Sequence, residues 1–94
     1  MDTNNYATIP QCGSLPDLTR FRVVVGAKQL RKALQKGTAR YVYLAENADP
    51  AITEPIKDLC RQESIHVTWI SSMTELGRAC GIEVGAAAAA VLNS

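Results

Sequence analysis

The stretch RVVVGAKQLRKALQKG, residues 22–37, places a strand pattern directly before a helical one. The β-branched run that ends at Val25 favours a strand, and Gly26 interrupts it. From Ala27 to Lys36 the apolar residues recur at helical spacing and fall within an arc of about 120° on a helical wheel. Gly37 is the residue type that commonly ends a helix. We therefore predict a strand that leads straight into an amphipathic helix.

The outer face of this predicted helix is basic. From Phe21 to Arg40 the sequence has six cations and no anion, although the whole chain has a net charge of only +1. A helix that begins just after Gly26 points free backbone N–H groups outward, which suits phosphate. Lys28 and Lys32 lie one turn apart and are candidates to bind successive phosphates, and Gln29 offers a donor and an acceptor to a base edge. The alternative is a solvated basic face that binds nothing.

A second strand-then-helix unit follows. Tyr41–Ala45 is a continuous apolar run, which is typical of a strand covered on both faces. After a turn at 49–50, Pro55 fits in the first turn of a helix, so we predict that this helix begins at Thr53 or Glu54.

A third unit comes next. Residues 65–69 alternate between apolar and polar, as in a strand, and Ser72 with Glu75 forms a capping box that opens a helix ended by Gly81. Three such units in succession predict an α/β sandwich with helices on both faces of a largely parallel sheet. The alanine-rich segment 86–92 fits either a helix or a fully buried strand, and its pattern does not decide between them.

The chain length predicts one domain, since there are 94 residues with a mass of 10.2 kDa. Residues 1–20 contain several turn-forming residues and no sustained period, so we predict a flexible N-terminal extension followed by a folded domain over 21–94. No apolar run approaches the roughly 20 residues of a membrane span, and no secretory signal is apparent. We therefore expect a cytoplasmic protein with no membrane partner.

The composition also argues against metal and cofactor chemistry. The three cysteines, Cys12, Cys60 and Cys80, are widely separated, and His66 is the single histidine. This pattern indicates neither a disulfide framework nor a zinc site. No glycine-rich loop of a nucleotide-binding type is present either. We predict no metal, no cofactor and no small-molecule substrate.

Two pairs of residues allow a catalytic interpretation, and each pair also has a simpler one. Cys80 with His66 has the residue types of a thiol nucleophile and its base, but a lone apolar-face cysteine is usually inert packing. Glu46 and Asp49 have the types of an acid/base pair, but loop acids are usually solvated or capping. We predict that the protein is not an enzyme.

The basic helix also allows a function of another class. The protein would then be an interaction or ribosome-assembly module whose basic helix docks on an acidic protein surface.

Three segments resemble, in order and spacing, the kink-turn RNA-binding ribosomal protein family of the archaeal L-seven-Ae type and its small bacterial relatives. They are Val24–Leu34, Ala45–Pro50 and Glu75–Ala86, and the resemblance runs from about residue 22 to residue 92. It implies a three-layer α/β/α sandwich with a four-stranded mixed sheet, in which 86–92 is a central strand. It also implies a non-catalytic ribonucleoprotein component that binds a kink-turn, with ribosomal RNA and the ribosome as expected partners.

The same resemblance implies RNA contacts from two places in the fold. The helix start would contact tandem G·A pairs and their phosphates through Gly26, Lys28, Gln29 and Lys32. The loop before the last strand would meet bulged nucleotides through Ile82, Glu83 and Val84, with Arg78 close to the RNA backbone. Ala27 departs from the family pattern, which has a threonine there, so a hydroxyl hydrogen bond is missing at the helix start.

Overall fold

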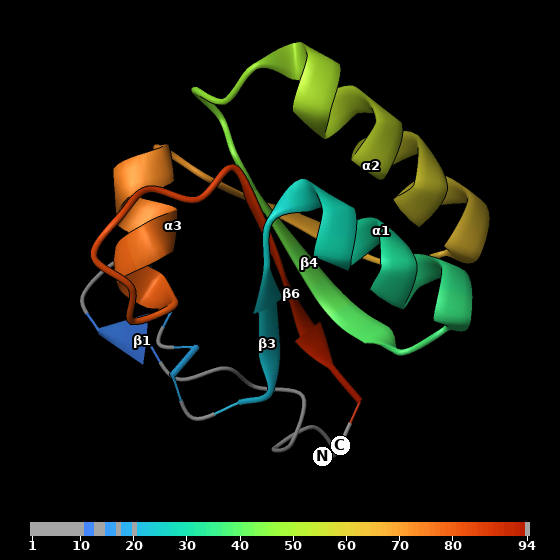
Figure 1. Ribbon diagram of the computed structural model, residues 1–94, viewed down its shortest axis with the longest axis horizontal. Helices are drawn as coiled ribbons and strands as arrows, with labels where there is room; N and C mark the ends of the chain where they lie inside the picture. Colours follow the sequence, from blue (N-terminus) through green and yellow to red (C-terminus); the bar gives the residue numbers. More distant parts are fainter. Residues whose placement is uncertain (1–10, 13–14, 17, 20, 94) are drawn as a thin grey trace.

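The central sheet of the computed structural model has four strands in the order β3-β6-β4-β5 (Figure 1). The structure describes residues 11–12, 15–16, 18–19 and 21–93. The strands of this sheet are β3 (Val23–Val25), β4 (Ala39–Ala45), β5 (Val67–Ile70) and β6 (Ala88–Leu92). Strand β6 is antiparallel to both β3 and β4, whereas β4 and β5 are parallel. The mixed sheet is confirmed and the largely parallel sheet is wrong, because β6 inserts between β3 and β4 in the opposite direction.

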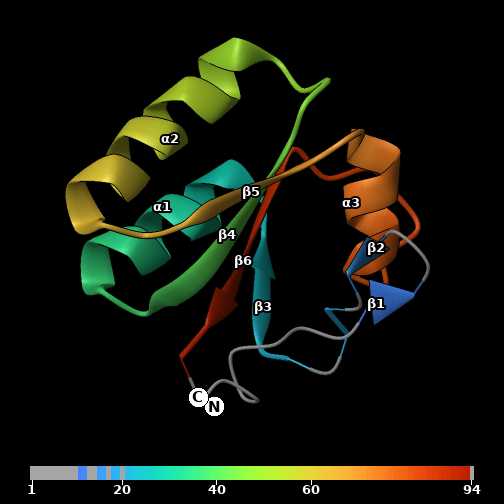
Figure 2. The ribbon, with the colours of Figure 1, turned by 180° about the vertical axis from the view of Figure 1, so that it is seen from behind.

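Helices cover both faces of the sheet and make the three layers that the resemblance implied. Helices α1 (Ala27–Lys36) and α2 (Pro50–Glu63) lie together on one face, and α3 (Met73–Ala79) lies on the other (Figures 1 and 2). None of these helices is long and apolar enough, within the described ranges, to cross a membrane.

The alanine run is a central strand, and its side chains are divided between two cores. Ala88 and Ala90 belong to the core under α1 and α2, whereas Ala89 and Val91 belong to the core under α3. All four are nearly inaccessible to solvent. Because the methyl groups are small, helices can pack closely on both sides of this strand. Tertiary burial therefore overrides the helix propensity of alanine.

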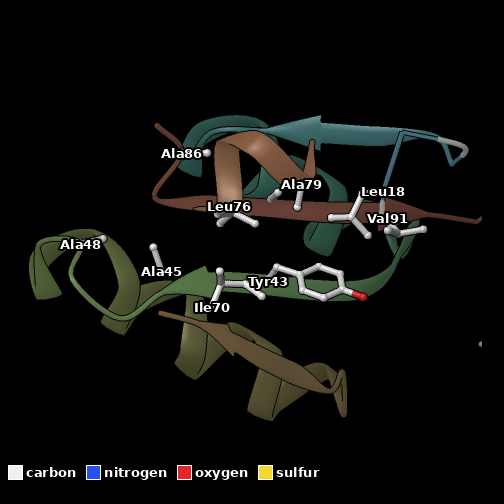
Figure 3. Close-up of a cluster of buried hydrophobic side chains, with 10 residues drawn as sticks. Leu18, Tyr43, Ala45, Ala48, Ile70, Leu76, Ala79, Ala86 and Val91 are labelled. Atoms are coloured by element: carbon white, nitrogen blue, oxygen red, sulfur yellow. The ribbon is translucent and has the colours of Figure 1, made fainter. Parts of the chain in front are cut away.

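The core under α3 includes a residue from the stretch assigned to the N-terminal extension. Leu18 is fully buried and points among Tyr43, Ala79 and Val91 (Figure 3). Its N–H donates to the carbonyl of Ala79 at 3.0 Å. Just before it, β1 (Gln11–Cys12) and β2 (Leu15–Pro16) pair as a small antiparallel ribbon. The packed domain thus includes Leu18, while residues 1–10, 13–14, 17 and 20 lie outside the described residues.

The helix ends follow from local capping. Helix α2 begins at Pro50, because Asp49 accepts from the N–H of Ala51 at 2.9 Å and a proline fits the first position. The predicted start at Thr53 or Glu54 is therefore wrong, and Pro55 lies inside the helix. The capping residue of α3 is confirmed, since Ser72 Oγ accepts from the N–H of Glu75 at 3.1 Å.

Candidate functional site

The start of α1 is formed by a glycine in a conformation that other residues rarely adopt. Gly26 is the N-cap, with φ 105° and ψ 147°. Its N–H donates to the carbonyl of Ala88 at 2.9 Å, and its carbonyl accepts the first helical bond from Leu30 at 3.0 Å. A Cβ at this position would meet nothing within 4 Å. The positive φ thus calls for glycine, and the open space leaves the backbone accessible to a ligand.

The partial positive charge at the start of α1 is not compensated by any side chain of that turn. No side chain caps it and it contains no acidic residue, whereas α2 and α3 are capped by Asp49 and Ser72. The first N–H groups of a helix have no partner within the helix and carry partial positive charge. Lys28 and Gln29 in this turn are exposed. An anionic group with acceptor oxygens suits this end of the helix.

The outer face of α1 continues the positive charge. Its inner face is buried in the core through Leu30, Ala33 and Leu34. The exposed side chains on the outside include four cations, Lys28, Arg31, Lys32 and Lys36. None of these four forms an ion pair with another described residue, whereas on α2 Lys57 pairs with Glu54 at 3.3 Å. The cations of α1 are thus available to an external anion.

The loop that connects α3 to β6 runs back along α3 in close contact with it. The N–H of Ile82 donates to the carbonyl of Gly77 at 3.0 Å. A Cβ on Gly77 would collide with the carbonyl of Val84, and a Cβ on Gly85 would lie 3.2 Å from the Cβ of Met73. Two glycines at these positions therefore allow the loop to lie on the helix backbone, which fixes its course.

The loop presents an apolar side chain to solvent. Val84 is 70% exposed, the most exposed large hydrophobic side chain of the described residues, and Glu83 beside it is also exposed. Ile82 is half-buried because it packs against the core under α3. Arg78 is exposed in the last turn of α3. The side chain of Val84 is therefore largely uncovered by the described part of the domain and is open to contact from outside it.

Backbone hydrogen bonds bring the helix start and the end of the loop to one edge of the sheet. Gly26 is bonded to Ala88, and the N–H of Ala45 at the end of β4 donates to Ala87 at 3.0 Å. Figure 1 shows α1 starting beside the first residues of β6, where the loop arrives. Gly26 is therefore bonded to the strand that the loop enters, and Lys28 and Gln29 follow Gly26 in the first turn of α1. Lys32 lies one turn farther along α1 than Lys28. Arg78 lies in the last turn of α3, away from the start of that helix at Met73.

Sequence reasoning assigned no role to two residues that shape this site. Gly77 makes room for Val84, as described above. Asn47, in the turn after β4, accepts a hydrogen bond from the N–H of Met73 through its Oδ1 at 2.8 Å. Both lie within segments that carry the family resemblance, Ala45–Pro50 and Glu75–Ala86, which was the available signal. Their contacts join separate elements and therefore need the fold.

Cys80 and Asp49, two residues of the catalytic types, have a raised pKa and a capping role respectively, and the other buried cysteine resembles Cys80. Burial raises the pKa of the Cys80 thiol, and it raises the pKa of Cys60 from 9.0 to about 11. A raised pKa reduces the reactive thiolate at neutral pH. Asp49 caps α2. No three His, Cys, Asp or Glu side chains of the described residues group together as metal ligands.

Comparisons with known proteins match the region that contains this site. The model of the ribosomal protein L7Ae/L30e/S12e/Gadd45 family matches residues 18–94. An RNA-binding protein of Bacillus pumilus is 40% identical over 70 residues, which cover 74% of this chain and 85% of that protein. An RNA-binding protein of a Geobacillus species is 44% identical over 72 residues, covering 77% and 88%. Among solved structures, the Giardia lamblia 15.5kD RNA binding protein has a TM-score of 0.72 at 29% identity, covering 77% of this chain and 61% of that one.

Proposed function

The chain belongs to the ribosomal protein L7Ae/L30e/S12e/Gadd45 family, and on this premise we propose that it binds a kink-turn or a similarly bent RNA without catalysing a reaction. The observation that carries the proposal is the junction of Gly26 and Ala88. It joins the uncapped, cationic start of α1 to the first residue of β6, and the loop with the exposed Val84 leads from α3 into this strand.

A bent RNA matches the chemistry of this composite surface. The A-form major groove is too narrow to be read, so RNA specificity usually comes from shape and from unstacked bases. A kink crowds phosphates and exposes the edges of its G·A pairs. The helix start offers backbone N–H groups and Lys28 to the phosphates, and Gln29 offers a donor and an acceptor to a guanine edge. Val84 offers apolar contact to unstacked nucleotides, which need contact area more than charge.

The remaining predicted contacts have supporting roles in the proposal. Lys32 neutralises phosphate farther along α1, and Arg78 approaches the RNA backbone beside the loop. Glu83 and Ile82 shape the loop on either side of the apolar contact. The proposed setting is the cytoplasm, with ribosomal RNA as the candidate target and the ribosome as the candidate assembly.

A gel-shift comparison with three RNAs tests the proposal. The first is a kink-turn, the second is the same RNA with its G·A pairs replaced by Watson–Crick pairs, and the third is a straight duplex of matched length. We expect binding to the kink-turn at least about tenfold tighter than to either control, a difference of about 1.4 kcal/mol. Equal affinity for all three RNAs would contradict kink-turn recognition and leave only nonspecific electrostatic binding.

A further inference from the structure

Asn47 connects two parts of the chain that are far apart in sequence. It lies in the turn that follows β4, and its Oδ1 accepts the N–H of Met73 at 2.8 Å across 26 residues. The turn itself is held firmly at the sheet edge. The N–H of Glu46 donates to Ile70 at 2.8 Å, and the neighbouring Ala48 is buried in the core. The backbone on both sides of Asn47 is therefore held in place.

Met73 is also hydrogen-bonded to the end of the loop that leads into β6. While its N–H is held by Asn47, its carbonyl accepts the N–H of Ala86 at 2.9 Å. Gly85 lies directly against the same residue, since a Cβ there would be 3.3 Å from the carbonyl carbon of Met73. The residue that begins α3 is thus bound from the turn on one side and from the end of the loop on the other.

Capping of α3 alone does not account for Asn47. Ser72 is already the N-cap and accepts the N–H of Glu75 at 3.1 Å. The bond from Asn47 satisfies a different N–H, and unlike Ser72 it comes from another element of the fold. Two caps on one short helix thus differ in what they join, because Ser72 acts within the helix and Asn47 ties the helix to the sheet edge.

We propose that Asn47 is a positioning residue, which holds Met73 and thereby keeps the 82–86 loop in the conformation that binds RNA. This inference rests on the proposed function and deepens it. Asn47 acts through the Met73 backbone and does not itself touch the RNA. Without this hydrogen bond the turn after β4 no longer holds Met73, so the 82–86 loop becomes more mobile. The fold and the cationic start of α1 remain intact.

The test compares Asn47→Ala with Ser72→Ala, a matched variant that removes the other cap from the same helix. Two quantities are measured for each protein. The first is amide hydrogen exchange by NMR in the free protein, at Ala86 relative to Ala90 in β6. The second is the affinity for the kink-turn RNA. Losing one exposed hydrogen bond of this kind should raise the relative exchange at Ala86 in Asn47→Ala about fivefold.

Affinity should fall several-fold in Asn47→Ala, while in Ser72→Ala both quantities should stay within about twofold of the wild type. A second variant, Asn47→Asp, keeps the acceptor oxygen, and we expect it to restore slow exchange at Ala86. Weaker binding with unchanged exchange would mean direct RNA contact and would overturn the inference. Faster exchange with unchanged binding, or no change in either quantity, would overturn it too. If the wild type fails to prefer the kink-turn, the proposed function fails, and the exchange comparison still tests the link from Asn47 to the loop.

Discussion

The carbonyl of Val84 packs against the Cα of Gly77, and there is no room between them for a methyl group. Gly77 is buried in the middle of α3, where alanine would ordinarily be the better helix former. The loop that carries Val84 thus depends on the absence of a side chain on the helix beneath it. The helix therefore has a residue of low helix propensity at position 77, which allows the loop to lie against it.

Gly77→Ala should therefore destabilise the protein and weaken RNA binding together. Gly to Ala in a helix normally stabilises by about 0.5–1 kcal/mol, whereas forcing a methyl group into a packed contact costs about 1–3 kcal/mol. The second effect is larger because the obstacle is backbone, so we expect a net loss of about 1–2 kcal/mol. Urea denaturation measures this loss, and the gel shift measures the effect of the displaced loop.

Thr74→Ala is the matched control for this variant, because Thr74 is exposed on the same helix and also changes to alanine. It should leave stability and binding nearly unchanged. Equal or greater stability of Gly77→Ala would show that the loop yields without cost, and the close contact would then have no energetic meaning.

The sequence was a good guide to local elements and a poor one to how they assemble. The strand-glycine-helix pattern around Gly26 and the capping by Ser72 are both local, and both are confirmed. The local units predict a largely parallel sheet, which is wrong. The direction of β6 relative to its neighbours depends on which strands it pairs with, and local units do not specify that. Its alanines likewise have no local reason to be a strand, and the family resemblance supplied that prediction.

The start of α2 contains two local signals that favour different first residues. Pro55 suggested a late start, since proline removes one hydrogen bond in a helix interior. Asp49 and Pro50 together make a stronger start, because one caps and the other fits the first helical position. The roles of Gly77 and Asn47 were missed for another reason. Each is defined by contact with a distant segment, which a single sequence does not specify.

Lys32→Ala should weaken binding to all RNAs by a similar factor. Lys32 is exposed one turn into α1, where it is placed to neutralise a phosphate without reading a base. Measured against salt concentration, the slope of log affinity should decrease in magnitude by about one unit or less. Lys57→Ala removes the same charge from α2, where Lys57 pairs with Glu54, and it should leave the slope unchanged. Equal effects of the two variants would indicate general charge attraction and no defined contact at α1.

Gln29→Ala should reduce discrimination between RNAs more than affinity for a generic duplex. Gln29 is exposed in the uncapped first turn of α1, so its amide is available to a base edge. A good two-point contact to a base is worth about 1–3 kcal/mol of discrimination. The preference for intact over disrupted G·A pairs should fall accordingly. Gln35→Ala, an exposed position on the same helix, serves as the control. An undiminished preference in Gln29→Ala would assign the reading of G·A pairs to other residues.

Tyr43→Phe should change how stability depends on alkaline pH. Burial, with smaller effects from Tyr41 and Cys80, raises the pKa of Tyr43 from 10.0 to about 12. The folded protein therefore keeps this phenol protonated where the unfolded chain releases the proton. The resulting stabilisation is complete below pH 10 and is lost as the pH rises from 10 to about 12. A shift of this size corresponds to about 2–3 kcal/mol.

Urea denaturation at a series of pH values compares the wild type with Tyr43→Phe. The wild type should lose about 2 kcal/mol more than the variant between pH 10 and pH 12, because phenylalanine has no proton to release. Cys60 gives a loss of the same sign that begins earlier, since burial raises its pKa from 9.0 to about 11, and this loss should be common to both proteins. Parallel curves above pH 10 would mean that Tyr43 ionises as readily in the folded protein as in the unfolded chain, in conflict with its burial between α3 and the sheet.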